Sequence, residues 1–296
     1  MKGIQSMNLW DPKTIKQIMA MFGLGFRKEF GQNFLTDPMV IEDIADACYQ
    51  TEDCTVLEIG PGIGVLTQAL CQRYQAVKAL EIDKSLIPVL KYTLDGYDNV
   101  TVYNEDVMQA NLEELLSTDF AEHPVTVCAN LPYYITSPIL MKLLESRLPF
   151  ESITVMVQEE VADRLCAKAG SKAYGAITAV VNYYGYAEKL LRVPADRFVP
   201  APKVDSAVIR ITLWKEKPCK PQSEEMLFRT IKAAFGQRRK TLANALSAGF
   251  SELSREQIRK AIEAVSEDPN VRGERLNIEQ FTRLSDLLGN FISSKN

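Results

Sequence analysis

The stretch Thr55-Val56-Leu57-Glu58-Ile59-Gly60-Pro61-Gly62-Ile63-Gly64 decides the fold of this chain. Its first half is a short apolar run typical of a buried strand, and a helical pattern over residues 65–74 follows the three alternating glycines. Glycine lets the backbone come close to a ligand, and free N–H groups at a helix start favour polar or anionic partners. The stretch therefore predicts a strand, a ligand-binding loop and a helix. A tight turn that binds nothing is the alternative.

The spacing of the glycines indicates the kind of ligand. A dinucleotide-binding loop reads G-x-G-x-x-G, but Val65 occupies the third glycine position here. The form E-x-G-x-G-x-G, with Gly60 and Gly62 inside it, is instead typical of sites for S-adenosylmethionine, which has no pyrophosphate to hold. We therefore expect S-adenosylmethionine as the cofactor and not a nicotinamide dinucleotide.

Short apolar runs alternate with helical patterns from about residue 38 to residue 213. This alternation predicts a doubly wound, Rossmann-like α/β sheet. The expected strands are residues 55–59, 77–82, 100–103, 125–129 and 153–157, with 180–186 and 207–213 as late antiparallel strands. The expected helices are residues 38–48, 65–74, 85–94, 113–116, 138–144 and 159–168.

Two acidic residues lie at the ends of strands of this sheet. Glu81 lies about 20 residues beyond the glycines, the offset at which a carboxylate accepts hydrogen bonds from both ribose hydroxyls of a nucleotide. Asp106 follows the third strand and can accept a hydrogen bond from the adenine amine of the cofactor. Ligands of open α/β sheets bind at the carboxyl ends of the strands, so we expect both acids in one crevice. Taken singly, each acid is more often a solvated turn residue.

The strand over residues 125–129 ends in Asn130-Leu131-Pro132-Tyr133. The Asn130 side-chain oxygen and a backbone carbonyl, of Leu131 or Pro132, can accept both N–H bonds of an exocyclic amine on a planar base. Pro132 stiffens the turn because its φ is fixed. The Tyr133 ring can stack on the base, which is worth about 1–3 kcal/mol per base in such sites. The tetrapeptide predicts a base-binding site, and an ordinary strand-end turn is the alternative.

The last part of the chain has a different pattern. Residues 214–221 are expected to form a linker, and the sequence beyond them looks helical to its end. We expect an N-terminal arm (1–25), an α/β domain (26–214) and a small all-helical domain (215–296). Two capping-box pairs predict helix starts in the last domain, Ser254 with Gln257 and Asn277 with Gln280.

The composition is that of a globular protein of 296 residues with a net charge of −4. No apolar stretch reaches the roughly 18 residues that a membrane span needs, and no signal peptide is recognisable. The six scattered cysteines favour reduced thiols, and a single histidine argues against a zinc site or histidine-based catalysis. We expect a cytoplasmic monomer without a metal.

The basic residues are concentrated in one segment. Residues 203–240 contain ten basic and four acidic side chains, a net charge of +6 in a chain of −4. Segregation of this kind favours a local phosphate-binding face, and a solvated helix face is the alternative. The candidate RNA-binding residues are Lys203, Arg238, Arg239 and Lys240.

With these features in order, the chain closely resembles the KsgA/RsmA family of ribosomal RNA adenine dimethyltransferases, from about Phe26 to Leu284. The resemblance rests on seven segments: residues 27–35 (RKEFGQNFL), the glycine loop, 130–133 (NLPY), 158–164 (QEEVADR), 171–175 (SKAYG), 198–208 (FVPAPKVDSAV) and 235–241 (FGQRRKT). Tyr134 departs from the pattern, since many relatives have asparagine there, and the first 20 or so residues have no family counterpart.

The resemblance implies that residues 26–214 form a Rossmann-like S-adenosylmethionine-dependent methyltransferase domain and that the helical domain (215–296) binds RNA. It also implies a specific reaction. Members of the family dimethylate N6 of two adjacent adenosines in the hairpin loop near the 3′ end of small-subunit (16S) ribosomal RNA, late in subunit assembly, with S-adenosylmethionine as donor. The family's cofactor positions carry over to Asn33, Leu35, Gly60, Glu81, Asp106 and Asn130. The extruded adenine would lie between Tyr133 and Phe198, for which core filling is the alternative role.

Other functions compete with this one. A 23S ribosomal RNA adenine-N6 methyltransferase of the macrolide-resistance type shares the cofactor core, but residues 171–175 and 235–241 favour the small-subunit enzyme. A DNA adenine methyltransferase would need a larger target-recognition region. A non-catalytic ribosome-assembly factor is disfavoured because the predicted site residues are intact.

Overall fold

The computed structural model of this protein describes residues 7–27, 31–48 and 51–294. The chain divides into two compact units. The first comprises Met1–Ala162 and Glu188–Leu213, and the second comprises Asp163–Ala187 and Trp214–Asn296. The second unit thus includes residues 163–187, a segment that the sequence assigns to the methyltransferase domain.

The first unit is built on a sheet that has seven strands among the described residues, in the order β4-β3-β2-β5-β6-β9-β7. Strands β4, β3, β2, β5 and β6 pair in parallel, and β9 is antiparallel to β6. The strands are β2 (Thr55–Ile59), β3 (Ala76–Leu80), β4 (Val100–Tyr103), β5 (Val125–Asn130), β6 (Phe150–Gln158), β7 (Gly185–Val193) and β9 (Ser206–Leu213). The predicted α/β sheet is confirmed.

Strands β2 and β5 are neighbours at the centre of the sheet. Their apolar residues are buried along the strands, as expected for parallel strands covered on both faces. Their parallel register aligns Ile59 with Ala129. Gly60 and Asn130 therefore leave the sheet side by side, at the point where the strand order reverses and ligands of open α/β sheets bind.

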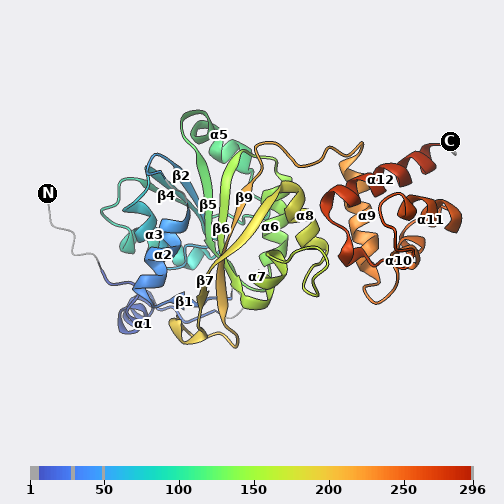
Figure 1. Ribbon diagram of the computed structural model, residues 1–296. Helices are drawn as coiled ribbons and strands as arrows, with labels where there is room; N and C mark the ends of the chain where they lie inside the picture. The colour runs from blue at the N-terminus through green and yellow to red at the C-terminus, as the bar shows by residue number, and fades with distance from the viewer. Residues whose placement is uncertain (1–6, 28–30, 49–50, 295–296) are drawn as a thin grey trace. The chain divides into compact units, whose positions relative to one another are not determined.

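Helices cover both faces of this sheet. Figure 1 shows α2 and α3 on one face and α6 on the other. Between β1 and β7 the chain forms the helices α2 (Pro38–Cys48), α3 (Val65–Cys71), α4 (Ile87–Thr93), α5 (Leu112–Glu122), α6 (Thr136–Glu145), α7 (Glu159–Leu165) and α8 (Ala176–Tyr184). A 3-10 turn, η2 (Lys84–Leu86), precedes α4.

A second, two-stranded sheet lies beside the first. Strand β1 (Phe34–Leu35) pairs antiparallel with β8 (Phe198–Val199), so that Leu35 is opposite Phe198. Before it, α1 (Pro12–Met21) buries Ile15, Ile18 and Met19 in the same core. These pairings attach the segment before α2 to the first unit.

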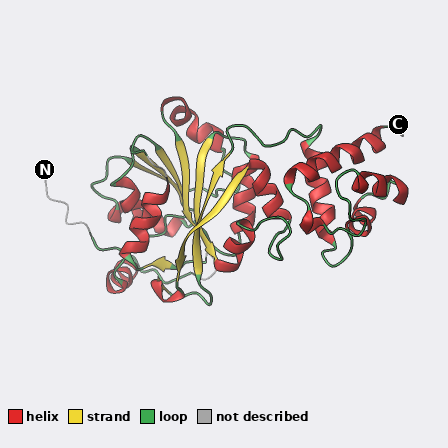
Figure 2. Cartoon of the chain, viewed as in Figure 1, coloured by secondary structure: helices red, strands yellow, loops and turns green. Residues whose placement is uncertain are grey.

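The second unit is helical, apart from the start of β7, and Figure 2 shows that its C-terminal part consists of helices and loops. Its helices after residue 214 are α9 (Glu224–Gly236), α10 (Leu242–Gly249), α11 (Arg255–Glu263) and α12 (Ile278–Ser293), with a 3-10 turn η4 (Gly273–Arg275). Both predicted capping boxes are confirmed, Ser254 with Gln257 at α11 and Asn277 with Gln280 at α12.

The prediction of a strand over residues 180–186 is wrong. Residues 176–184 form α8, and the strand begins only at Gly185. Valine and tyrosine favour strands locally, but Val180, Val181 and Tyr183 are buried in the helical unit, where the Tyr183 ring lies 5.7 Å from that of Phe228. Tertiary packing therefore overrides the local preference.

Two expectations from composition can be compared with the structure. All six cysteines are free thiols, and four of them are buried. No helix among the described residues is long and apolar enough to cross a membrane.

Close packing of α9 against α10 generates a prediction for stability. A Cβ atom added at Gly249 would lie 2.5 Å from the Cβ of Ala233, whereas one added at Gly236 would meet nothing within 4 Å. We expect Gly249→Ala to lower the free energy of unfolding by about 1–3 kcal/mol through overpacking. Gly236→Ala, also at the last position of a helix, should be neutral or slightly stabilising. Thermal denaturation measures both, and equal stabilities would contradict this packing.

Candidate active site

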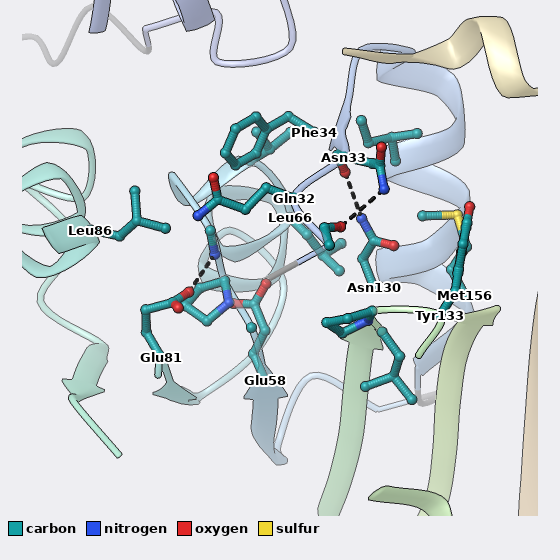
Figure 3. A pocket seen from close by; sticks show the side chains of 18 of the residues that line it. Gln32, Asn33, Phe34, Glu58, Leu66, Glu81, Leu86, Asn130, Tyr133 and Met156 are labelled. Carbon is teal, nitrogen blue, oxygen red and sulfur yellow. Dashed lines mark hydrogen bonds between the residues drawn. The ribbon is translucent and has the colours of Figure 1, made fainter. Parts of the chain in front are cut away.

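A pocket opens at the carboxyl ends of β2 and β5, as Figure 3 shows. Four segments that are far apart in the sequence form most of its lining. They are residues 31–35, the glycine loop after β2, the residues after β3 and the turn after β5. The predicted site residues found in this lining are Asn33, Leu35, Gly60, Gly62, Glu81, Asn130, Leu131, Pro132 and Tyr133.

The glycine loop adopts a backbone that only glycine accepts easily. Gly60 and Gly62 have φ values of +71° and +62°. A Cβ atom at Gly62 would lie 2.9 Å from Cε1 of Phe34, while one at Gly60 would meet nothing within 4 Å. Gly62 thus lets the β1 segment lie against the loop, and Gly60 leaves the pocket open at the end of β2.

Glu81 connects β3 to the glycine loop. Its Oε2 accepts a hydrogen bond from the Gly62 N–H at 3.1 Å, and its Oε1 accepts one from the Asp83 N–H at 2.8 Å. Burial raises the pKa of Glu81 to about 7, and the two N–H groups oppose that shift. The carboxylate is held in place at the pocket wall, and each oxygen keeps a further lone pair for a ligand hydroxyl.

Asp83 does not line the pocket, but it supports the pocket wall, and the sequence assigned it no role. It is 2% exposed, and its Oδ1 accepts a hydrogen bond from Arg27 at 3.2 Å while its Oδ2 accepts one from Gln32 at 3.1 Å. These contacts fasten the segment before β1 to the end of β3. The only signal in the sequence was a second acid two residues after Glu81.

The Asn130 amide is oriented by a contact across the pocket. Its Nδ2 donates to the Asn33 carbonyl at 3.2 Å (Figure 3), so its Oδ1 is directed elsewhere and accepts no hydrogen bond from the described residues. The Pro132 carbonyl already accepts from the Ile135 N–H and the Thr136 hydroxyl. Of the two carbonyls that the sequence left open, the structure therefore favours that of Leu131 as the free acceptor.

Tyr133 and Tyr134 differ in how they are held. The Tyr133 hydroxyl lies 2.5 Å from Oγ of Ser206, the first residue of β9, and burial raises the pKa of this hydroxyl. Tyr134 is 62% exposed and lines the pocket edge, close to where a Cβ at Gly31 would lie. The structure thus fixes the Tyr133 ring through Ser206, which sequence reasoning missed.

Two predicted site residues do not line the pocket. Asp106 uses its carboxylate in the turn after β4, where it accepts from the Met108 N–H at 2.9 Å and from Gln109 at 3.3 Å. Phe198 is 3% exposed and belongs to the hydrophobic core. The roles of both residues remain predictions, and the position of Phe198 agrees with the core-filling alternative.

The basic candidates occupy different environments. Arg238 donates hydrogen bonds to the carbonyls of Lys172 and Tyr174, and so joins residues 171–175 to the end of α9 inside the helical unit. Arg239 and Lys240 are exposed in the same unit, and Lys203 is exposed in the other. Arg238 therefore has a structural role whatever it binds.

Four further pocket residues were given no role of their own from the sequence. Glu58 is 1% exposed, Ile82 is an apolar side chain that is 49% exposed, and Gln32 and Met156 complete the wall. The sequence did carry a signal for Glu58, because it is the first residue of the E-x-G-x-G-x-G form and the one ionisable residue in the apolar run 55–59.

Sequence comparison gives the family context of this site. The family model described as ribosomal RNA adenine dimethylase matches residues 23–289. The chain is 47% identical to "Ribosomal RNA small subunit methyltransferase A" of Alkaliphilus metalliredigens, over 93% of this chain and 96% of that protein. It is 46% identical to the protein of the same name from Geobacillus thermodenitrificans, over 94% and 96% of the two chains.

Structure comparison agrees on the fold. A dimethyladenosine transferase from Plasmodium falciparum is similar with a TM-score of 0.73 and 24% identity, over 88% of this chain and 98% of that one. The 23S rRNA methyltransferase ErmE is similar with a TM-score of 0.67 and 27% identity, over 87% and 100%.

The contact between Gly62 and Phe34 can be tested with a matched pair of variants. Gly62→Ala and Gly23→Ala both place alanine at a positive φ, which costs about 1–2 kcal/mol. Only the Cβ at position 62 would meet another residue within 4 Å. We expect Gly62→Ala alone to weaken binding of S-adenosylmethionine, by about tenfold or more, in calorimetric titrations. Equal affinities in the two variants would contradict the predicted cofactor loop.

Proposed function

Because the chain belongs to the ribosomal RNA adenine dimethylase family, we propose that it transfers methyl groups from S-adenosylmethionine to N6 of two adjacent adenosines in the 3′-terminal hairpin loop of 16S ribosomal RNA, late in small-subunit biogenesis. The observation that carries the proposal is the Asn130 amide. Its nitrogen is engaged by Asn33, and its oxygen is available at the end of β5 beside the glycine loop.

The pocket has features that fit the donor. The glycine loop leaves the end of β2 open, Glu81 presents acceptor oxygens for ribose hydroxyls, and the exposed apolar side chain of Ile82 offers a surface for the adenine ring. The residues proposed to hold the donor are Asn33, Leu35, Gly60, Gly62, Glu81, Asp106 and Asn130. When bound, the donor supplies a methyl group already activated on a sulfonium sulfur.

The residues after β5 supply the other half of the mechanism. Asn130 Oδ1 and the Leu131 carbonyl accept the two N–H bonds of the target amine, which draws the nitrogen lone pair out of conjugation with the ring. Both groups are held in advance, because Asn130 is bonded to Asn33 and the Leu131 N–H donates to the Met156 carbonyl at 3.2 Å. The rate gain comes mainly from orientation, so no strong acid or base is required.

The target base must leave its stack to reach this turn, which costs a few kcal/mol. Stacking on Tyr133 offsets that cost, and the bond to Ser206 fixes the ring before the base arrives. We retain Phe198 as a second stacking surface only as a prediction, since its ring is buried here. Dimethylation further requires that the turn accept an amine that already carries one methyl group.

A 23S-specific methyltransferase is the principal competing function. ErmE shares the fold at 27% identity. The curated relatives at 46–47% identity are named as small-subunit enzymes and match more than 90% of the chain. The difference in identity favours 16S ribosomal RNA as substrate, in the cytoplasm where subunits are assembled. A non-catalytic assembly factor would have no need for the oriented amide.

The reaction can be tested with labelled S-adenosylmethionine and undermethylated small subunits. Asn130→Ala should lower methyl transfer about 100-fold or more, because the amine is no longer oriented. Tyr133→Ala should bind the donor normally and lose transfer to a similar extent. Asn290→Ala, which removes an exposed amide from α12, serves as control.

Near wild-type transfer by either active-site variant would refute the proposed roles. Label that enters large-subunit RNA and not small-subunit RNA would refute the proposed substrate.

The helical unit is proposed to bind RNA phosphates through Arg239 and Lys240. Removing both charges by Arg239→Ala and Lys240→Ala should weaken small-subunit RNA binding and reduce the slope of log affinity against log salt by about 1–2. Arg259→Ala with Lys260→Ala is the control, because Glu263 and Glu256 lie four residues from these side chains and pair with them. An unchanged salt slope would contradict the assignment.

A further inference from the structure

Glu58 is a carboxylic acid inside a strand whose other residues are Thr55, Val56, Leu57 and Ile59. All five residues of β2 are buried, and Glu58 is 1% exposed. Its side chain nevertheless reaches the wall of the cofactor pocket, and Figure 3 shows it between those of Glu81 and Asn130. A buried carboxyl group is costly unless it is neutral or has a partner.

The two acids of this pocket, Glu58 and Glu81, differ in their hydrogen-bond partners. Glu81 accepts hydrogen bonds from two backbone N–H groups, which stabilise a negative charge. Oε2 of Glu58 is fully buried and has no hydrogen-bond partner among the described residues. Glu58 therefore lacks the support that would let it ionise in the free protein.

Among the described residues, the titratable groups that interact with Glu58 carry no positive charge. They are Glu81 at the end of β3, the Cys128 thiol opposite Glu58 on β5 and the Cys71 thiol on α3. Burial raises the pKa of Glu58 to about 8, the Thr67 hydroxyl partly opposes the shift, and Glu81 adds to it. Burial also raises the pKa of both thiols, so they stay neutral at pH 7. A neutral acid thus faces the pocket.

We propose that Glu58 is the counter-ion of the bound donor, neutral in the free protein and ionised once the cationic donor occupies the pocket. This inference rests on the proposed use of S-adenosylmethionine. In the binding step the Glu58 carboxylic acid loses its proton to the solvent, and the carboxylate pairs with the positive charge that the ligand brings. One proton is released and no other bond is made or broken.

A buried carboxyl group used in this way would select for charge. A neutral nucleoside of the same shape brings no positive charge to stabilise the Glu58 carboxylate. Glu58 therefore adds no ion pair to the binding free energy of such a ligand. A ligand with an ammonium or sulfonium group gains an ion pair in a site shielded from water, where such pairs are strong. Glu58 would then be a specificity residue for the amino-acid end of the donor, while Glu81 serves the ribose.

Calorimetric titration in two buffers of different ionisation enthalpy counts the protons released on binding. The full-length protein is titrated at pH 7 with S-adenosylmethionine, S-adenosylhomocysteine and 5′-methylthioadenosine, which has no charge. All three ligands carry the ribose that Glu81 is proposed to contact, so the contribution of Glu81 cancels in the comparison. We expect S-adenosylmethionine to release about one proton more than 5′-methylthioadenosine. Release retained with S-adenosylhomocysteine assigns the ammonium as partner, and release lost assigns the sulfonium.

The dependence of affinity on pH follows the same linkage. Glu81, whose pKa is raised to about 7, titrates in the wild type and in Glu58→Gln alike, so the ratio of the two affinities isolates Glu58. Below pH 8 the wild type must give up the Glu58 proton to bind the donor, so this ratio should rise by up to about tenfold per pH unit and level off above about pH 8. Glu58→Gln should remove this contribution and the extra proton. Glu267→Gln, at an exposed loop position, should behave as the wild type.

Glutamine has the shape and neutrality of the protonated acid, so the variant is expected to fold, which thermal denaturation checks. If it does not fold, infrared difference spectra of the wild type decide, since the protonated carboxyl band should disappear when the donor is added. The proposal is overturned if the donor releases no more protons than 5′-methylthioadenosine, or if Glu58→Gln releases as many as the wild type. Failure to bind S-adenosylmethionine at all would instead refute the proposed function.

Discussion

The parallel pairing of β2 with β5 is the constraint on which the rest of the site depends. It aligns Ile59 with Ala129, so the glycine loop and the Asn130 turn emerge as neighbours from the centre of the sheet. One loop has the backbone freedom to receive a donor, and the other has the acceptors to hold an amine. Neither could act without the other, because methyl transfer needs the two reacting atoms held in line at short range. The strand order reverses between these two strands, which leaves their carboxyl ends uncovered by a crossover helix.

A second set of contacts to the site comes from residues 32–35, which precede the first strand of the large sheet in the chain. The Asn33 carbonyl fixes the Asn130 amide, Gln32 is bonded to Asp83, and Phe34 lies against Gly62. The pairing of β1 with β8 anchors this segment to the core. The donor side and the acceptor side are therefore linked through residues 32–35, and a change in that segment alters both. This explains in physical terms why a short, loop-like stretch carries two of the residues that the family resemblance assigns to the cofactor.

The features that could be predicted from the sequence were those that depend on short local patterns of residues. The glycine spacing, the acid after the second strand and the Asn130 turn are each defined by residues close together in the chain. The α/β alternation predicted that all three lie at the same edge of the sheet. Contacts between distant segments left no such signal. Asn33 and Asn130 are 97 residues apart, and Tyr133 and Ser206 are 73 residues apart. The wrong strand over residues 180–186 has a related cause, because the burial that makes it helical is supplied by α9, which begins about 40 residues later.

The central claim is that Asn130 Oδ1 and the Leu131 carbonyl hold the target amine beside the donor. A crystal structure of the protein with S-adenosylhomocysteine and adenosine monophosphate tests it most directly. The account predicts N6 within about 3.2 Å of both oxygens, with the amine between them and the donor sulfur. An adenine ring bound elsewhere, or bound on Tyr133 with its N6 turned away from Asn130, would contradict it.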